Sequence, residues 1–179
     1  MIPAFKEWAI VCQALGTGQQ SILIRKGGIA EGREGFSFKH REFLLFPTWF
    51  HEQVGRTRLP AETPVPLQPE GEVEFHYSAT LEWSGVVTDE TKLAGLREHH
   101  ILSDAVVAER FAYDEAPGVH VAFLRVFRLE PPARMPMEAS FGGCRSWVEI
   151  PDIEGSALVS VLSEEEHQRR LQLIRALLE

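Results

Sequence analysis

The chain contains few cysteines and no long apolar run. Only two of its 179 residues are cysteine, Cys12 and Cys144, and their wide separation predicts reduced thiols in a cytoplasmic protein rather than a disulfide scaffold. No stretch approaches the roughly 18 apolar residues that cross a bilayer. Charged Lys6 and Glu7 lie where a signal peptide needs apolar residues. We therefore expect a cytoplasmic protein without a membrane segment.

The familiar short motifs of catalysis and metal binding are also missing. The sequence has no phosphate-binding P-loop, no GxGxxG between a strand and a helix, no HExxH and no CxxC pair. These absences exclude the easily recognised nucleotide-hydrolysing, dinucleotide-binding and zinc classes. No metal site is predicted, and no residue pattern specifies a cofactor.

Negative charge predominates in the whole chain, and only the N-terminal third carries an excess of positive residues. The net charge of −8 argues against a protein that coats itself in nucleic acid, because phosphate binding needs clustered cations. Residues 1–60, however, carry 8 Lys and Arg against 5 Asp and Glu, whereas residues 61–179 carry 10 against 21. This asymmetry permits a local anion site on an acidic protein.

The chain is organised around residues 18–53, where two apolar strands flank a polar loop. Ser21–Ile24 is a β-branched run that predicts a short strand, and it ends at Arg25 and Lys26 before two glycines. We expect the two charged side chains to face solvent or a ligand at this strand end.

The second strand of this stretch, Phe43–Phe46, is stopped by Pro47. Thr48 is then expected to cap a short helix over residues 49–51. Polar side chains are dense between the two strands, where binding groups often collect. A solvated hairpin loop with ordinary surface ion pairs explains them equally well. These residues are Glu31, Arg33, Glu34, Lys39, His40, Arg41 and Glu42.

Periodicity assigns most of the other elements. Residues 3–15 repeat apolar side chains every three to four positions, which predicts an amphipathic helix. Four prolines within residues 55–71 predict a long surface loop. Strict alternation over Glu72–Trp83 predicts a long strand with one face on the core. The apolar run Val119–Leu129 predicts another strand, ended by the prolines at 131–132.

Capping residues mark the start of three further helices. Thr88-Asp89, Ser103-Asp104 and Ser163 each precede a segment with apolar residues at helical spacing. The sequence as a whole predicts a single α+β domain over residues 1–179. We expect a mixed, mainly antiparallel sheet or a partly closed β-barrel flanked by helices.

The second stretch of interest is Phe141–Trp147, which contains two glycines, a thiol, a guanidinium and an indole. The favoured interpretation is a glycine bulge that leads into a strand over residues 146–150. Arg145 and Trp147 could also form a contact surface for a planar or anionic ligand. A nucleophilic pair of Cys144 with a histidine is disfavoured, because the local sequence matches no cysteine-hydrolase signature.

Several segments together resemble the bacterial domain-of-unknown-function family 1802. The resemblance covers nearly the whole chain, and the family brings no established activity with it. The segments are FKEWA from Phe5, LIRKGGI from Leu23, FLLFPT from Phe43 and GGCRSW from Gly142.

A weaker resemblance links residues 18–25 to the ASCH branch of the PUA-like β-barrels. The motif of that branch is G-x-K-x-x-E-x-R, and Gly18 and Arg25 stand at the right spacing. Gln20 and Leu23 replace the lysine and the glutamate. The resemblance therefore implies the fold, while the RNA binding and amide hydrolysis of some family members do not follow from it.

The favoured functional prediction is a non-enzymatic binding module for an anionic ligand, with RNA, single-stranded DNA or a nucleotide first. Clustered cations beside glycines and aromatic rings can hold phosphate and stack on bases. The predicted binding residues are Arg25, Lys26, His40, Arg41, Thr48, His51, Arg145 and Trp147, with Trp49 as another stacking face.

Two alternatives remain open from the sequence. A nuclease or other hydrolase could use Glu7, Glu31, His40 and His51 as acid–base or metal groups. The acidic C-terminal two-thirds could instead recognise a basic protein partner.

Overall fold

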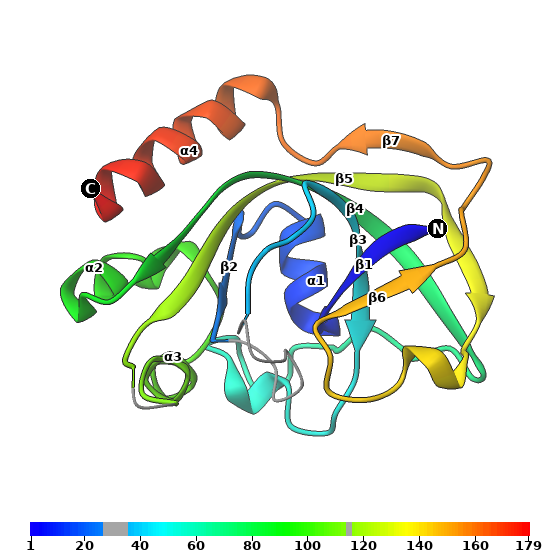
Figure 1. Ribbon diagram of the computed structural model, residues 1–179, viewed down its shortest axis with the longest axis horizontal. Coiled ribbons are helices and arrows are strands. Elements are labelled where there is room, and N and C mark those ends of the chain that lie inside the picture. The colour runs from blue at the N-terminus through cyan, green and yellow to red at the C-terminus, as the bar shows by residue number, and fades with distance from the viewer. Residues whose placement is uncertain (27–35, 114–115) are drawn as a thin grey trace.

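The computed structural model describes residues 1–26, 36–113 and 116–179. This part of the chain forms one strongly curved sheet with α1 on its concave side and α4 across the outside (Figure 1). The strand order is β2-β5-β4-β3-β1-β6, and β7 pairs with the free part of β5. Only β1 and β3 run parallel among these described pairs; the others are antiparallel. The predicted mixed, mainly antiparallel α+β fold is thus confirmed.

The helices and strands follow one another along the chain without a repeated unit. Short 3-10 helices lie at Val54–Arg56, Arg97–His99 and Ala139–Phe141. The main elements are β1 Ile2–Trp8, α1 Ala9–Gly16, β2 Ile22–Arg25, β3 Glu42–Thr48, β4 Glu72–Val87, α2 Glu90–Gly95, α3 Asp104–Phe111, β5 Val119–Pro136, β6 Trp147–Ile150, β7 Ala157–Ser160 and α4 Glu164–Leu178.

The helix predicted over residues 3–15 is wrong for its first half. Residues up to Trp8 form β1, which pairs with β3 on one side and with β6 on the other, and the helix begins only at Ala9. Hydrogen bonds to two neighbouring strands outweigh the local helical pattern. The short helix predicted after Thr48 is also absent, because the Thr48 hydroxyl donates to the Glu7 carbonyl at 3.0 Å instead of capping.

The two long strands run further than predicted. Alternation correctly marks the start of β4, which continues to Val87. β5 does not stop at Pro131 but reaches Pro136. The pairing of β4 with β5 jumps from Phe75 opposite Ala133 to Tyr77 opposite Arg128, so the prolines lie in an irregularity of the ladder. A bulge tolerates a residue without a backbone donor.

The predicted helix starts are confirmed by their capping hydrogen bonds. Asp89 accepts from the Thr91 amide, Ser103 from the Val106 amide, and Ser163 from the Glu166 amide. No helix in the described part of the chain is long and apolar enough to cross a membrane.

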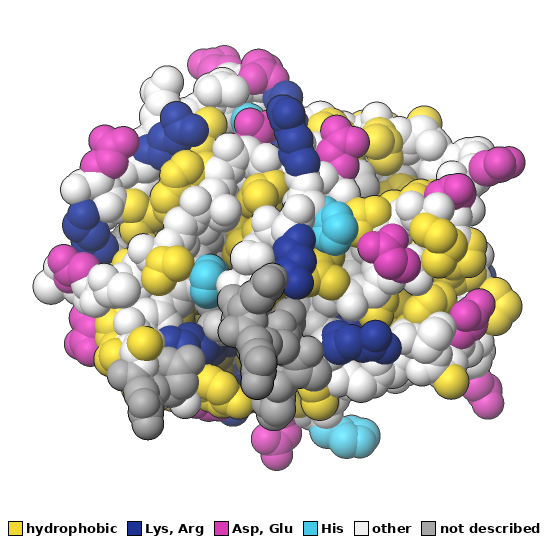
Figure 2. Space-filling model, viewed as in Figure 1, with side chains coloured by type: hydrophobic (Ala, Val, Ile, Leu, Met, Phe, Trp, Pro, Cys, Tyr) yellow, Lys and Arg dark blue, Asp and Glu magenta, His cyan; other side chains and the backbone are white. Residues whose placement is uncertain are grey.

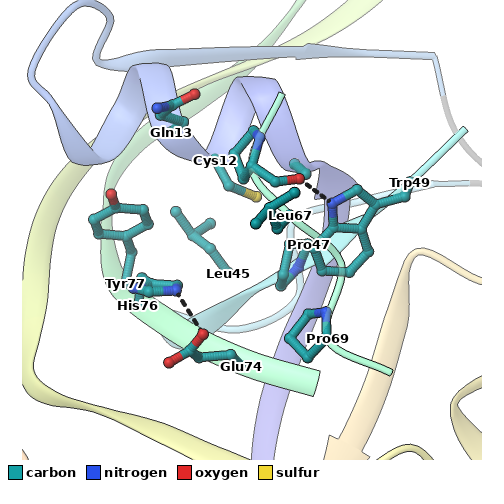
Figure 3. Close-up of a pocket in the computed structure, with 12 residues that line it drawn as sticks. Cys12, Gln13, Leu45, Pro47, Trp49, Leu67, Pro69, Glu74, His76 and Tyr77 are labelled. Carbon is teal, nitrogen blue, oxygen red and sulfur yellow. Dashed lines mark hydrogen bonds and ion pairs between the residues drawn. The ribbon is translucent and has the colours of Figure 1, made fainter. Parts of the chain in front are cut away.

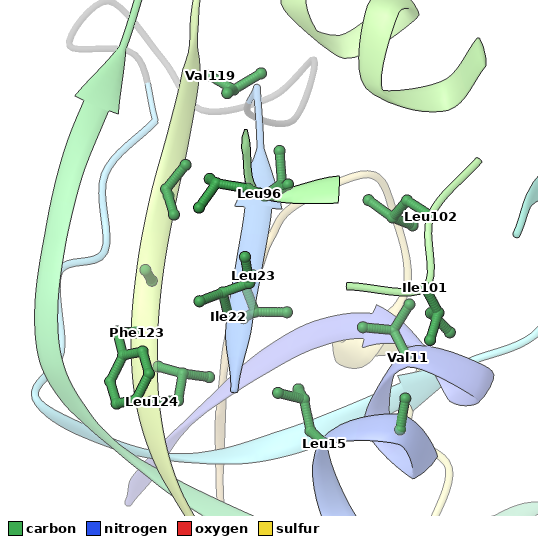
Figure 4. Packing of buried hydrophobic residues seen from close by; sticks show 14 of the residues in the cluster. Val11, Leu15, Ile22, Leu23, Leu96, Ile101, Leu102, Val119, Phe123 and Leu124 are labelled. Carbon is green, nitrogen blue, oxygen red and sulfur yellow. The ribbon is translucent and has the colours of Figure 1, made fainter. Parts of the chain in front are cut away.

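The main core fills the concave side of the sheet. Figure 4 shows part of this cluster, in which side chains of α1, β2 and β5 meet those of residues 96–102. β1, β2 and α3 also contribute buried side chains to this cluster, so the core packing fixes the positions of their ends. The labelled residues are Val11, Leu15, Ile22, Leu23, Leu96, Ile101, Leu102, Val119, Phe123 and Leu124.

The curved sheet approaches a barrel without closing. Its two edges are β2 and β6, and the residues after Phe36 lie between them. The Phe36 ring lies 5.1 Å from the His120 ring, and the Trp147 indole donates to the Ser37 carbonyl at 3.2 Å. Aromatic packing around Phe5 therefore fills the gap where backbone pairing is missing in the described chain.

Candidate functional site

Arg25 lies at the centre of a buried polar cluster. Glu7 is 1% exposed, and its carboxylate accepts from the Trp8 amide at 2.9 Å and from Arg25 Nη1 at 3.2 Å. Arg25 Nη2 donates to Ser146 Oγ at 3.0 Å, and the guanidinium lies 5.2 Å from the centre of the Phe5 ring. Arg25 was expected to face solvent or a ligand; instead it ties the end of β2 to β1 and to the start of β6.

A cleft with a basic lining opens beside this cluster. It measures about 210 Å³ and is formed by the ends of β1 and β2, the 3-10 helix after β3, and one face of α3. We call it the basic cleft. Its lining residues are Trp8, Arg25, Lys26, Arg56, Glu109, Arg110 and Tyr113.

Cations surround the Trp8 indole in the basic cleft. The guanidinium of Arg110 lies 4.9 Å from the centre of this ring and that of Arg56 lies 5.7 Å away. Arg56 also pairs with Glu109 at 2.6 Å, whereas Arg110 donates to the Ile24 carbonyl. The stacked geometry fixes both guanidinium groups at the cleft wall.

Burial makes the Arg110 charge costly. Desolvation lowers the pKa of Arg110 to about 10; Glu7 opposes this effect, whereas Arg25 and Arg56 add to it. Together with Lys26, the described lining has four cationic side chains against Glu109 and the adjacent Glu7, an excess of two positive charges. A bound anion would relieve the repulsion among these cations.

Lys26 is held in place by the backbone on the opposite side of the cleft. Its Nζ donates to the Ala116 carbonyl at 2.6 Å and to the Gly118 carbonyl at 3.0 Å. These two bonds fix the position of the ammonium group beside the end of β2.

A second cavity lies on the other side of the β1–α1 junction (Figure 3). This loop pocket of about 180 Å³ is covered by the proline-rich residues 66–69, which the Trp49 indole anchors through a 2.8 Å bond to the Pro66 carbonyl. The consecutive residues Trp8 and Ala9 line the basic cleft and the loop pocket, respectively. The two cavities thus lie on either side of the Trp8–Ala9 backbone.

The loop pocket is mainly apolar, with a few polar side chains at its rim. Glu74 accepts from Arg134 at 2.8 Å and lies 3.3 Å from His76, and the Arg134 hydrogen bond is the main cause that lowers the pKa of this carboxyl. The thiol of Cys12 is buried, and its pKa is raised by desolvation and then by Glu7. This thiol is protonated at neutral pH and packs as a small apolar group.

The structure brings together only some of the predicted binding residues. Arg25 and Lys26 line the basic cleft, and Thr48 contacts the backbone of Glu7 next to it. Arg41 is exposed just before β3, at the end opposite Thr48, about 20 Å away at the rise of a strand. His51 is exposed in the turn after this strand.

The remaining predicted residues belong to the region around β6. The His40 ring packs against Trp147 at 4.8 Å, and Trp147 packs edge-on against Phe5 at 4.8 Å. Arg145 is exposed and donates to the Ser140 carbonyl at 3.3 Å. These contacts place Trp147 in the aromatic packing between the sheet edges.

The hydrolase residues do not form a described cluster. Glu31 lies outside the described residues. Glu7 is committed to Arg25, His40 packs on Trp147, and His51 is exposed. Within the described residues, no group of three or more His, Cys, Asp and Glu side chains could hold a metal ion.

Sequence reasoning missed most of the cleft lining, namely Trp8, Arg56, Glu109, Arg110 and Tyr113. One signal was available for Arg110. It stands four residues after Val106, which is buried at 2% exposure, so helical spacing places both on the same face of α3. An arginine on the buried face of a helix needs a partner or a function. For Arg56 and Tyr113 the local sequence carried no comparable signal.

A protein-family model covers most of the chain. The family model described as "Domain of unknown function (DUF1802)" matches residues 4–172. None of the curated proteins matches the sequence.

Similar solved structures include crystal structures of an ASCH protein from Zymomonas mobilis. The unsubstituted protein and a serine-to-alanine mutant each align with a TM-score of 0.50 and 14% identity, over 96% of this chain and 94% of theirs. A tyrosine-to-phenylalanine mutant aligns with the same score and identity over 96% of each chain. At this identity the likeness shows the fold alone, and it confirms the expected ASCH-like architecture.

Proposed function

The chain belongs to the DUF1802 family of domains of unknown function, and we propose that it binds an anionic ligand, a nucleotide or a single-stranded nucleic acid, in the basic cleft. The observation that carries this proposal is the convergence of three arginines and a lysine around Trp8. They come from three separate segments of a chain whose net charge is −8. Such a local excess attracts phosphate while the acidic remainder repels it.

The cleft residues divide into those that would contact the ligand and one that would position the strand ends. Arg56, Arg110 and Lys26 would contact phosphate oxygens, because their charges lie at the cleft wall. Tyr113 is 58% exposed and offers a ring on which a base can stack. Arg25 would act through Glu7 and Ser146 by holding the strand ends in position, rather than by touching the ligand.

Titration of a labelled single-stranded RNA decamer at 50 and 200 mM salt tests this proposal. With about three phosphate contacts, the affinity for a single strand is expected to fall about 20-fold over this range. Arg56→Gln should weaken binding about fivefold at low salt. It should also reduce the slope of log affinity against log salt concentration by the contribution of about one phosphate contact. Tyr113→Ala should weaken it about tenfold through lost stacking.

Arg128→Gln is the matched control. Arg128 is exposed on β5 and paired with Glu130 at 2.7 Å, as Arg56 is paired with Glu109, but it does not line the cleft. The proposal requires that this variant bind like the unsubstituted protein. Binding that is insensitive to salt, or an equal loss in Arg56→Gln and Arg128→Gln, would refute it. Arg25 is unsuitable as a test residue because its substitution would also remove the bonds to Glu7 and Ser146.

A further inference from the structure

A groove larger than the basic cleft lies on the other face of α3. It measures about 470 Å³ and runs between α2 and α3. Leu93 of α2 and Val107 and Phe111 of α3 form its apolar walls, whereas Glu109 and Arg110 of α3 line the basic cleft. In Figure 1 the two helices lie at the end of the molecule away from β6. An inference about this groove is thus independent of the proposed function.

The groove is lined by a largely buried side chain that can donate a hydrogen bond. His100 lines it and is 5% exposed, and its Nδ1 accepts the Leu102 amide at 3.1 Å. This bond fixes the tautomer, so the proton of the neutral ring is on Nε2. Burial lowers the pKa of His100 to about 4, with Arg58 and Arg110 adding to the effect, so the ring is neutral at pH 7.

The Nε2–H of His100 has no acceptor among the described residues. The hydrogen bonds of this residue to described residues are the Nδ1 bond and the bond that Arg58 Nη2 donates to its carbonyl. Among the described residues, the fully enclosed side-chain atoms without a partner are Arg125 Nε and His167 Nε2, so His100 Nε2 is accessible. Since His100 lines the groove, this donor is available there to an occupant that carries an acceptor atom.

The charges at the rim exclude an anionic occupant. Glu90 and Asp104 line the groove, and the one cation in the described lining is Arg97. Arg97 already donates to Asp104 and to Glu98, each at 2.9 Å. An incoming carboxylate or phosphate would meet an excess of negative charge.

We propose that the α2–α3 groove binds a neutral apolar small molecule with a hydrogen-bond acceptor, such as a ketone or an ester. Its oxygen would accept from His100 Nε2, and its hydrocarbon part would lie along Leu93, Val107 and Phe111. The groove volume lies within the range of about 300–1,000 Å³ that small-molecule sites occupy. A stable protein partner would need about 800 Å² of surface, far more than a groove between two short helices supplies.

Displacement of the neutral dye Nile red tests this site on the intact protein. We expect the dye to fluoresce on binding, 2-octanone to displace it, and octanoate to displace it at least tenfold less well. His100→Asn keeps an acceptor for the Leu102 amide but withdraws the Nε2 donor. It should weaken 2-octanone about fivefold, the value of one neutral hydrogen bond.

A pair of tryptophan variants on α3 separates this groove from other apolar surface. Ala108 lines the groove and Ala105 does not, and both side chains are exposed, so neither substitution disturbs the core. Ala108→Trp should weaken Nile red at least tenfold, whereas Ala105→Trp should leave it unchanged. Equal affinities in the two variants, better displacement by octanoate, or an unchanged ketone affinity in His100→Asn would overturn the proposal. Displacement by a basic amphipathic peptide but not by 2-octanone would overturn it in favour of a protein partner.

Discussion

The imidazole of His100 is neutral because two features of its surroundings favour the uncharged ring. The side chain is 5% exposed, so protonation would place a charge out of water. Arg58 and Arg110 add repulsion, and the pKa falls from 6.5 to about 4. Because the folded protein disfavours the protonated ring, His100 should also make the stability of the fold depend on pH.

We predict that the free energy of unfolding falls as the pH falls from 6.5 to 4. In this window the unfolded chain binds a proton at His100 and the folded chain does not, so acid favours unfolding, by about 3 kcal/mol at most. His100→Asn should lose this part of the pH dependence. Urea unfolding of both proteins at pH 7, 5.5 and 4.5 measures it, since the other histidines are common to both. Parallel pH profiles would contradict the prediction.

Arg25 illustrates the limit of sequence reasoning at the scale of one residue. A cation at the end of a strand, followed by glycines, has the local pattern of a ligand group. Its partners are Glu7 and Ser146, which are 18 and 121 residues away in the sequence. The position of the candidate site could be predicted from residues 25 and 26. The division between positioning and contacting residues could not, because it depends on these distant neighbours.

Among the elements, α1 is held against β4 by a close approach at its last residue. A methyl group added at Gly16 would overlap the ring of Tyr77. Tyr77 also lines the loop pocket, so the absence of a side chain at Gly16 sets the depth at which this ring lies. Glycine has a low helix propensity, but at this position its lack of a side chain allows the Tyr77 ring of β4 to lie against the helix.

Gly16→Ala is expected to lower the free energy of unfolding by about 1–3 kcal/mol through overpacking. In a Tyr77→Ser background the ring is gone, so the same substitution should stabilise by up to about 1 kcal/mol through helix propensity. Chemical denaturation of the four proteins measures this change of sign. Gly55→Ala, at a position with no atom within 4 Å of the added carbon, serves as control and should change stability by less than about 0.5 kcal/mol. A stabilised single Gly16→Ala variant would contradict the prediction.

Elements with local signals could be predicted, and those defined by distant pairing could not. The alternation of β4 and the caps of α2, α3 and α4 lie within the segments that they describe, and they were identified correctly. β1 was assigned as a helix because its apolar spacing suits a helix, whereas its two pairing strands lie far along the chain. β7 was missed because all four of its residues are exposed and show no alternation.

Across the whole molecule, the unclosed sheet depends on aromatic side chains for its closure. Phe36 is 6% exposed and lies 5.0 Å from Phe38 and 6.1 Å from Phe5. These aromatic contacts lie between the sheet edges β2 and β6. On the β6 side, the Trp147 ring packs against Phe5. The described edges are therefore joined by side chains rather than by a backbone ladder.

We predict that Phe36→Ala lowers the free energy of unfolding by about 3–5 kcal/mol, the usual cost of truncating a buried phenylalanine. Amide hydrogen exchange should accelerate most in β2 and β6, because these edges lose their common filling. Leu158→Ala on β7, which is 59% exposed, is the control and should change neither quantity. Uniform acceleration over all strands, without preference for the two edges, would argue against side-chain closure.

The distribution of charge over the surface follows the same large-scale organisation. On the face seen in Figure 2, basic side chains lie among apolar ones near the middle, and acidic side chains lie mostly around the edges. The overall charge of −8 keeps polyanions away from most of the surface. Binding of a phosphate ligand is then confined to the few places where cations outnumber acids.

The bond between Arg25 and Ser146 also has a consequence for the order of folding. It closes a loop of 121 residues, and contacts of such long range form late because the entropy of loop closure must first be overcome. α3 can form early from local interactions, and the end of β2 also pairs with β5, but the Arg25–Ser146 bond forms only when the residues before β6 have arrived. A chain truncated before β6 would therefore keep all four cationic residues of the basic cleft but lack the Ser146 hydroxyl that anchors Arg25. The full geometry of the basic cleft would thus be completed only late in folding.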